Sequence, residues 1–150
     1  MFTHLRPVYL ADTDAAGVVY FNRLLEICHE TYEVWLMDRG LSLQRLIQQG
    51  QFAIPLIHAD IDFLAPAYCG DRLEIGLQIE QASDHRFICN YHVRRQRPEP
   101  MEVIARAQTQ HLCIALPARQ KCALPPDWRS AIGDDPVSYT HLTLPTILRV

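Results

Sequence analysis

The stretch from residue 22 to residue 39 most limits the folds open to this chain, because its apolar side chains recur at helical spacing. At 100° per residue one side of the helix is apolar and the opposite side holds three glutamates. Asn22 suits an N-cap and Gly40 suits the position after the helix. The pattern predicts one long amphipathic helix with a single buried side. The apolar side carries Leu24, Ile27, Cys28, Val34 and Trp35, with Leu25, Tyr32 and Leu36 at its border, and the polar side carries Glu26, Glu30 and Glu33.

Extended segments account for most of the remaining pattern. Residues 73–79 alternate apolar and polar side chains, as a half-buried strand does, and Gly70-Asp71 marks the turn before them. A short second helix is expected over Ser42 to Gln49, ending at Gly50. The order of one strand, a long helix and four strands predicts an α+β fold with one antiparallel sheet and the helix laid against it. The other expected strands cover residues 2–10, 53–64, 86–95 and 102–116.

The composition narrows the classes of function. The chain has 150 residues, enough for one domain, and a formal net charge of −3, which argues against a nucleic-acid binder. No run of 18 apolar residues predicts a membrane span, and no signal-peptide pattern stands at the N-terminus, so we expect a cytoplasmic protein. The cysteines are odd in number and include no C-x-x-C pair, so we expect free thiols and no metal site. They are Cys28, Cys69, Cys89, Cys113 and Cys122.

The C-terminal stretch does not fit this pattern. Breaker residues 133–136 precede an apolar segment, 136–150, that has no partner among the predicted strands. We therefore expect a domain over residues 1–133 and a tail over 134–150 that is disordered or not native to the protein, and the tail is left out of the predicted fold.

A carboxylate in a loop of small residues is the first candidate for chemistry. Asp14 is followed by Ala15, Ala16 and Gly17, which leave room for a ligand to approach. The helix start that follows offers unpaired N–H groups and a positive dipole end, which can stabilise the oxyanion formed when a thioester carbonyl is attacked. The competing interpretation is that Asp12 and Asp14 shape a turn or cap a helix.

The loop and the helix start together resemble a known signature. It is that of the hotdog-fold thioesterases of the 4-hydroxybenzoyl-CoA type, a family whose fold is a curved antiparallel sheet wrapped around one long helix. The likeness continues through residues 60–66 and Gly70-Asp71, and covers about residues 5–130. The signature lies in Asp12-Thr13-Asp14-Ala15-Ala16-Gly17-Val18-Val19-Tyr20-Phe21-Asn22.

The resemblance implies roles for single residues. Asp14 would be the nucleophile or general base, and the backbone N–H of Phe21 would polarise the thioester carbonyl. Some members carry a histidine where this chain has Phe21, so any role of that imidazole is absent here. Gly17, Tyr20 and His58 would line the substrate site. His58 could donate to a substrate hydroxyl, or it could be a satisfied core histidine. Neither a cofactor nor a metal is implied.

Four further segments carry a closer resemblance: residues 28–33, 55–60, 111–114 and 122–125. They are similar to the cyanobacterial 1,4-dihydroxy-2-naphthoyl-CoA hydrolases of phylloquinone (vitamin K1) biosynthesis. This resemblance implies hydrolysis of that thioester to the free acid and CoA. The alternatives are a thioesterase for 4-hydroxybenzoyl-CoA or a short acyl-CoA, a hotdog dehydratase, and a non-catalytic acyl-CoA-binding protein.

Basic residues on a turn between two strands are the candidates for binding CoA. The resemblance assigns its phosphates to Arg86, with Ser83 and His85 beside it, and a solvated turn arginine is the competing interpretation. Arg94, Arg95 and Arg97 are expected to be solvated strand ends. Glu30, which matches the catalytic glutamate of another hotdog group, is expected to be solvated with Glu26 and Glu33. The resemblance also implies a homodimer or homotetramer with active sites at the subunit boundary.

Overall fold

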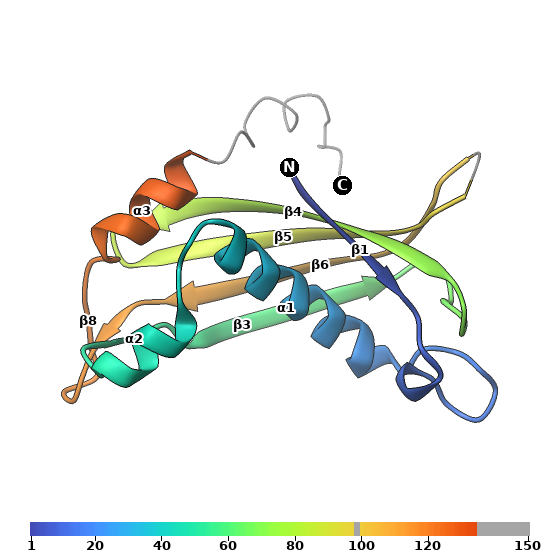
Figure 1. The fold of residues 1–150 in the computed structure, drawn as a ribbon, viewed down its shortest axis with the longest axis horizontal. Coiled ribbons are helices and arrows are strands. Elements are labelled where there is room, and N and C mark those ends of the chain that lie inside the picture. Colours follow the sequence, from blue (N-terminus) through green and yellow to red (C-terminus); the bar gives the residue numbers. More distant parts are fainter. Residues whose placement is uncertain (98–99, 135–150) are drawn as a thin grey trace.

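A five-stranded antiparallel sheet forms the centre of the computed structural model, which describes residues 1–97 and 100–134. Its strand order is β1-β4-β5-β6-β3, and α1 (Phe21–Asp38) lies across one face (Figure 1). The predicted α+β layout is confirmed. The strands are β1 (Phe2–Pro7), β3 (Leu56–Phe63), β4 (Arg72–Ser83), β5 (Arg86–Arg95) and β6 (Glu102–Leu112).

Alternation along the central strands builds the core. On β4 the predicted set Leu73, Ile75, Leu77 and Ile79 is buried, and β5 buries every second residue from Phe87 to Arg95. These side chains face α1, which buries a complementary stripe. The buried side chains of α1 are Leu24, Ile27, Cys28, Thr31, Tyr32, Trp35 and Leu36. Val34, expected in this stripe, is only half-buried, because the buried side of the helix is centred closer to Thr31.

The two ends of α1 differ from one another in how they are capped. The predicted N-cap Asn22 is wrong: the helix begins at Phe21, and Tyr20 holds the cap position without a side-chain capping bond. The C-terminal end is as predicted, with Gly40 at φ 73°. There the Leu41 N–H donates to Leu36 O (2.9 Å) and the Gly40 N–H to Met37 O (3.1 Å), the Schellman pattern.

Smaller elements cover the end of the sheet that lies away from the loop between β1 and α1. The predicted short helix is α2 (Leu43–Gln49), capped by the Ser42 side chain and ended by Gly50 at φ 65°. Two expected strands are split: β2 (Phe52–Ala53) separates from β3, and β7 (Ile114–Ala115) separates from β6 at Cys113. With β8 (Gln120–Lys121) they form a three-stranded sheet of order β2-β7-β8.

The chain described by the structure ends just after a third helix, α3 (Pro126–Gly133). It packs beside β4, with Trp128 and Ile132 buried. The domain boundary at residue 133 stays a prediction, because residues 135–150 of the predicted tail lie outside the described residues. In the described ranges, none of the helices combines the length and the apolar character needed to cross a membrane.

Candidate active site

The loop between β1 and α1 is closed at both ends by short backbone contacts. A 3₁₀ turn (η1, Leu10–Asp12) precedes it, and an isolated bridge pairs Thr13 with Val19. Within the loop the Asp14 N–H donates to Val18 O (2.9 Å). Gly17 adopts φ 81°, a conformation that side chains other than glycine's rarely permit. The loop is therefore a fixed turn with Asp14 as its first residue, where the Gly17 N–H donates to Asp14 O (3.0 Å).

The two oxygens of the Asp14 carboxylate have different surroundings. Oδ1 accepts the backbone N–H groups of Ala16 (2.8 Å) and Val18 (3.2 Å). Oδ2 has no hydrogen-bond partner among the residues that the structure describes, and the side chain is half-buried. Asp14 thus shapes its own loop, as the competing interpretation held, and still leaves one oxygen available for chemistry.

The first turn of α1 leaves backbone donors free beside this loop, the first of them at Phe21. The Val19 N–H donates to Ala67 O (2.9 Å) and the Tyr20 N–H to Asp12 O (3.2 Å). The Phe21 N–H, first in the helix, has no acceptor within residues 1–97 and 100–134. At the positive end of an 18-residue helix, this group is suited to an anionic oxygen.

An apolar pocket of about 370 Å³ opens beside the helix start. Phe21 and Phe63 meet edge to face across it, with ring centroids 6.3 Å apart. Both rings are largely exposed, Phe21 by 71% and Phe63 by 47%. Tyr20 is also exposed. The pocket is lined by Val18, Val19, Phe21, Leu24 and residues 63–67.

Asp12, two residues before Asp14, is buried in an ion-pair cluster. It accepts from Arg6 (2.5 Å to Oδ2) and from Arg23 in the first turn of α1 (2.8 Å to Oδ1), and the Tyr9 N–H donates to it (2.8 Å). Burial acts to raise the pKa of Asp12, but the hydrogen bonds from Arg6, Arg23 and Tyr9 outweigh it and hold this pKa well below its usual range. Asp12 therefore ties β1 to the helix start.

Two of the three helix glutamates are paired with arginines, and the third contacts a histidine ring. Glu30 contacts Arg6 (3.1 Å) and Arg23 (3.3 Å), Glu26 contacts Arg23 (2.9 Å), and Glu33 contacts the His29 ring (3.3 Å). With its carboxylate held by two arginines, Glu30 is not placed as a free general base.

The predicted substrate-binding histidine, His58, is exposed on β3. Its Nε2 lies 2.8 Å from Asp60 Oδ2. Its neighbour Ala59 pairs with the core residue Thr109, so strand alternation turns His58 to the sheet face away from α1. Within one chain His58 and Asp14 are not brought together.

The predicted CoA-binding residues lie at the opposite end of the sheet from Asp14. Ser83 Oγ accepts the His85 N–H (3.3 Å), and Arg86 has a buried Nε without a partner among the described residues. Figure 1 shows the β4–β5 turn at the end beside α3 and the Asp14 loop at the other end. A strand of 12 residues, as β4 is, spans roughly 36 Å at about 3.3 Å per residue.

Arg95 was expected to be solvated, and that prediction is wrong. The side chain is buried and contacts Asp71 (2.5 Å), Glu102 (3.2 Å) and the Pro66 carbonyl (2.6 Å). It fixes the turn after β3, on which the Asp14 loop rests. The sequence did contain a signal for this burial, because Arg95 continues the alternation of buried side chains along β5. Arg94 and Arg97 are partly exposed and pair with Glu74 and Glu102.

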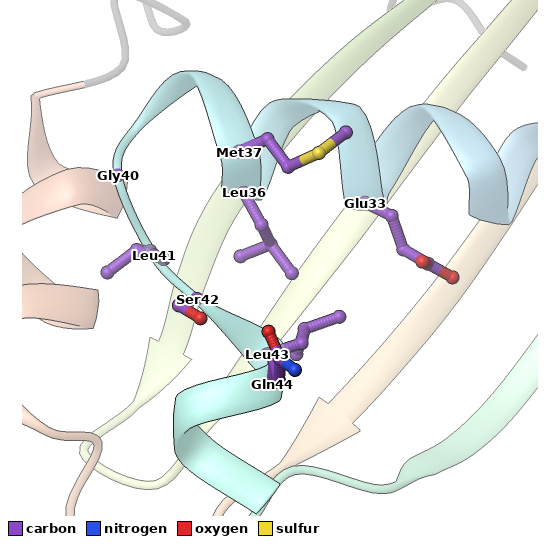
Figure 2. A pocket seen from close by; sticks show the side chains of 8 residues that line it. All are labelled: Glu33, Leu36, Met37, Gly40, Leu41, Ser42, Leu43 and Gln44. Carbon is purple, nitrogen blue, oxygen red and sulfur yellow. The ribbon is translucent and has the colours of Figure 1, made fainter.

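A second pocket of about 450 Å³ lies at the other end of α1. Figure 2 shows Leu36 and Leu43 turned toward the space between α1 and α2. None of the predicted site residues lines it. Across the described ranges no cluster of three or more His, Cys, Asp or Glu side chains is arranged to hold a metal ion.

Comparison with known proteins places this geometry in a family. Residues 8–132 match the model of the thioesterase-like superfamily. A 1,4-dihydroxy-2-naphthoyl-CoA hydrolase from Synechocystis is 59% identical to this chain, and the match covers 89% of this chain and 95% of the relative. A second hydrolase of the same name, from Picosynechococcus, is 42% identical, and the match covers 83% of this chain and 87% of the relative. The crystal structure of a 1,4-dihydroxy-2-naphthoyl-CoA thioesterase from Synechocystis superposes with a TM-score of 0.84, at 59% identity over 89% of this chain and 96% of that one. The predicted hotdog fold is thereby confirmed, and the chain belongs to the thioesterase-like superfamily.

Proposed function

We propose that this protein hydrolyses 1,4-dihydroxy-2-naphthoyl-CoA to the free acid and CoA, as a cytoplasmic step of phylloquinone biosynthesis. The observation that carries the proposal is the free Oδ2 of Asp14 on a loop that leads directly into the unpaired Phe21 N–H of the helix start, where an apolar pocket opens. The names of the relatives at 59% and 42% identity support this choice of acyl group.

The arrangement gives the Asp14 carboxylate two possible chemical roles. Oδ2 can attack the thioester carbon, expel CoA thiolate and form a mixed anhydride that water then opens. It can instead take a proton from a water molecule that attacks the same carbon. In both schemes the carbonyl oxygen becomes an anion, which the Phe21 N–H and the helix dipole stabilise. In both schemes the two hydrogen bonds to Oδ1 keep Oδ2 pointed away from the loop.

The apolar pocket suits the acyl group better than it suits the nucleotide. Its volume of about 370 Å³ falls in the usual range for small-molecule sites, and apart from the backbone its walls are apolar. An aromatic acyl ring placed there meets Phe21 and Phe63, whose edge-to-face contact leaves both rings partly exposed.

A homodimer completes the site in this proposal. Arg86 is too far along β4 to meet a CoA held at Asp14 of the same chain. β3 is an edge strand whose residues are nearly all exposed, including Leu56, Ile57 and Phe63. Two copies joined antiparallel along β3 bury these side chains, and the twofold axis sets the Asp14 end of one copy beside the β4–β5 turn of the other. Two such dimers can form a tetramer.

Release of CoA from a panel of acyl-CoAs tests the proposal. We expect kcat/KM for 1,4-dihydroxy-2-naphthoyl-CoA to exceed that for acetyl-CoA at least about 100-fold, since a missing set of aromatic contacts costs this much. A higher kcat/KM for 4-hydroxybenzoyl-CoA would change the acyl group that we assign to the substrate and would leave the assigned reaction, thioester hydrolysis, unchanged. Binding of these thioesters without release of CoA would instead show a non-catalytic acyl-CoA-binding protein.

A further inference from the structure

We propose that Cys113 and Cys122 form an oxidisable dithiol, a modification site at the base of the β4–β5 turn. Their Sγ atoms lie 3.6 Å apart. Cys113 stands at the junction between β6 and β7, and Cys122 follows β8 directly. Both are free thiols in the structure.

Backbone pairing already holds these two residues at disulfide range. The register Ile114–Lys121 and Ala115–Gln120 sets Cys113 directly opposite Cys122, and the Cys122 N–H donates to Cys113 O (3.1 Å). Residues paired in this way have Cα atoms about 5.5 Å apart, within the range that a disulfide spans. To form the bond, the sulfurs must approach to about 2.05 Å, so the hairpin must adjust on oxidation.

The surroundings of the two thiols assign them different roles. Cys113 is fully buried, and burial together with the hydrogen bond that its thiol makes with Cys122 raises its pKa to about 12. Cys122 is half-buried and is the one that a small oxidant can reach. Of the remaining cysteines, Cys28 and Cys89 lie in the core, and Cys69 is exposed on the turn that follows β3.

Hydrogen peroxide supplies the oxidant in a balanced reaction. The Cys122 sulfur attacks one peroxide oxygen and breaks the O–O bond, which releases water and leaves Cys122 as a sulfenic acid. The Cys113 sulfur then attacks Cys122, breaks the S–O bond and releases a second water that carries the Cys113 proton. The two sulfurs lose two electrons in total, and the peroxide gains them.

The dithiol connects directly to the candidate CoA turn. The Cys113 N–H does not pair back to Cys122 but donates to His85 O (2.8 Å), and the Leu124 N–H donates to Asp84 O (2.8 Å). Movement of the hairpin therefore reaches the backbone of Ser83 to Arg86. This step rests on the proposed function, in which that turn holds the CoA phosphates. Oxidation should then weaken CoA binding and leave the Asp14 chemistry at the other end of the sheet intact.

The test treats the full chain with hydrogen peroxide and compares it with the reduced protein. Peptide mass mapping should show Cys113 joined to Cys122 with the loss of two hydrogens. The Kd for free CoA and the KM for acyl-CoA should both rise at least about fivefold, with kcat within about twofold, because the affected contacts are remote from the reacting carbon. Addition of dithiothreitol should restore both values.

Two single variants serve as controls. Cys122→Ser should form no internal disulfide and should keep its CoA affinity in peroxide, whereas Cys69→Ser should behave as the unaltered protein. Peroxide that oxidises Cys69 but leaves Cys113 and Cys122 open to alkylation would overturn the dithiol site. A mapped disulfide with unchanged CoA affinity would overturn the coupling to the turn. Failure of the proposed function is distinguishable from both, since it abolishes turnover in the reduced protein.

Discussion

Two aspartates that stand two residues apart in the same loop have opposite surroundings. The Asp12 carboxylate is 1% exposed and is held by Arg6, Arg23 and a backbone N–H. The Asp14 carboxylate is half-buried and keeps one oxygen free. A carboxylate that already neutralises two arginines cannot also act as a nucleophile at low cost, so the division of roles follows from burial and pairing.

Replacing Asp14 by asparagine tests the catalytic half of this division. Asparagine keeps the Oδ1 acceptor for the Ala16 and Val18 N–H groups but is neither a nucleophile nor a base. We expect kcat to fall at least about 100-fold, the lower end of what general-base catalysis supplies, with the melting temperature within about 2 °C. A variant with near-normal kcat would refute the mechanism.

Replacing Asp12 by asparagine tests the structural half. The change removes the one buried carboxylate from Arg6 and Arg23, which keep only the more exposed helix glutamates as anionic partners. We expect the free energy of unfolding to drop by about 3 kcal/mol, the lower end for a broken buried pair. The melting temperature should then fall by roughly 10 °C. The variant that remains folded should lose less kcat than Asp14→Asn. Thermal unfolding and kcat, measured side by side for both variants, separate the two roles.

Sequence reasoning located these residues unevenly. Asp14 could be identified because the whole signature is local: it consists of eleven consecutive residues that keep the spacing of the family pattern. The partners of Asp12 were not, because Arg6 and Glu30 are separated by 24 positions and meet only when β1 packs beside α1. Arg95 was missed for the same reason: a charge near a strand end looks solvated until its partners, Asp71 and Glu102, are placed around it.

At the scale of elements, the contact between α1 and the sheet contains a buried polar chain within an apolar core. The His111 ring stacks on Phe87 (centroids 4.8 Å) and lies 4.7 Å from Tyr32 of α1. Its Nε2 is 2.9 Å from Thr109 Oγ1, which in turn is 3.3 Å from the Tyr91 hydroxyl. Burial, aided by the nearby His29, lowers the pKa of His111 from 6.5 to about 4.

This lowered pKa predicts a pH-dependent loss of stability. Between pH 6.5 and about 4 the unfolded chain binds a proton at His111 that the folded chain does not, so stability falls as the pH falls. The loss can reach about 1.4 kcal/mol per pH unit, or about 3 kcal/mol in all. His111→Phe should reduce the dependence of the free energy of unfolding on pH in this range, whereas His58→Gln, a change at an exposed histidine, should not. Any loss due to Asp12 comes below pH 4, in a separate window. An unchanged slope in His111→Phe would show that other groups control it.

Element types were easier to predict than element ends. Period-2 alternation identified β4, and glycines marked the ends of α1 and α2, because both signals are set by neighbouring residues. The split of the last long strand at Cys113 was missed. There the chain leaves one sheet for another: the Cys113 N–H still donates to His85 in the register of β5, while Cys113 O already accepts the Cys122 N–H of the next hairpin, and no local pattern shows that change.

At the scale of the whole molecule, the chain carries its two candidate half-sites at opposite ends of one sheet. The Asp14 loop and Phe21 lie at one end, and Ser83 to Arg86 lie at the other, with the length of β4 between them. A ligand that contacts both therefore needs two chains. In the proposed isologous dimer each active site would take Asp14 from one subunit and Arg86 from the other, and the two sites would be equivalent.

This arrangement predicts complementation between two defective variants. Arg86→Ala should raise KM at least about tenfold with kcat nearly intact, and Asp14→Asn should be nearly inactive. When the two proteins are unfolded together and refolded, a hybrid dimer has one site with both changes and one site with neither. Random pairing at equal amounts leaves about a quarter of all sites with both original residues, so kcat/KM should recover to about a quarter of that of the unaltered protein.

Mixing without exchange of subunits is the control. If Asp14 and Arg86 served the same site from one chain, no hybrid would contain an intact site. The activity would then stay at the average of the two variants, about 5% or less of the unaltered value.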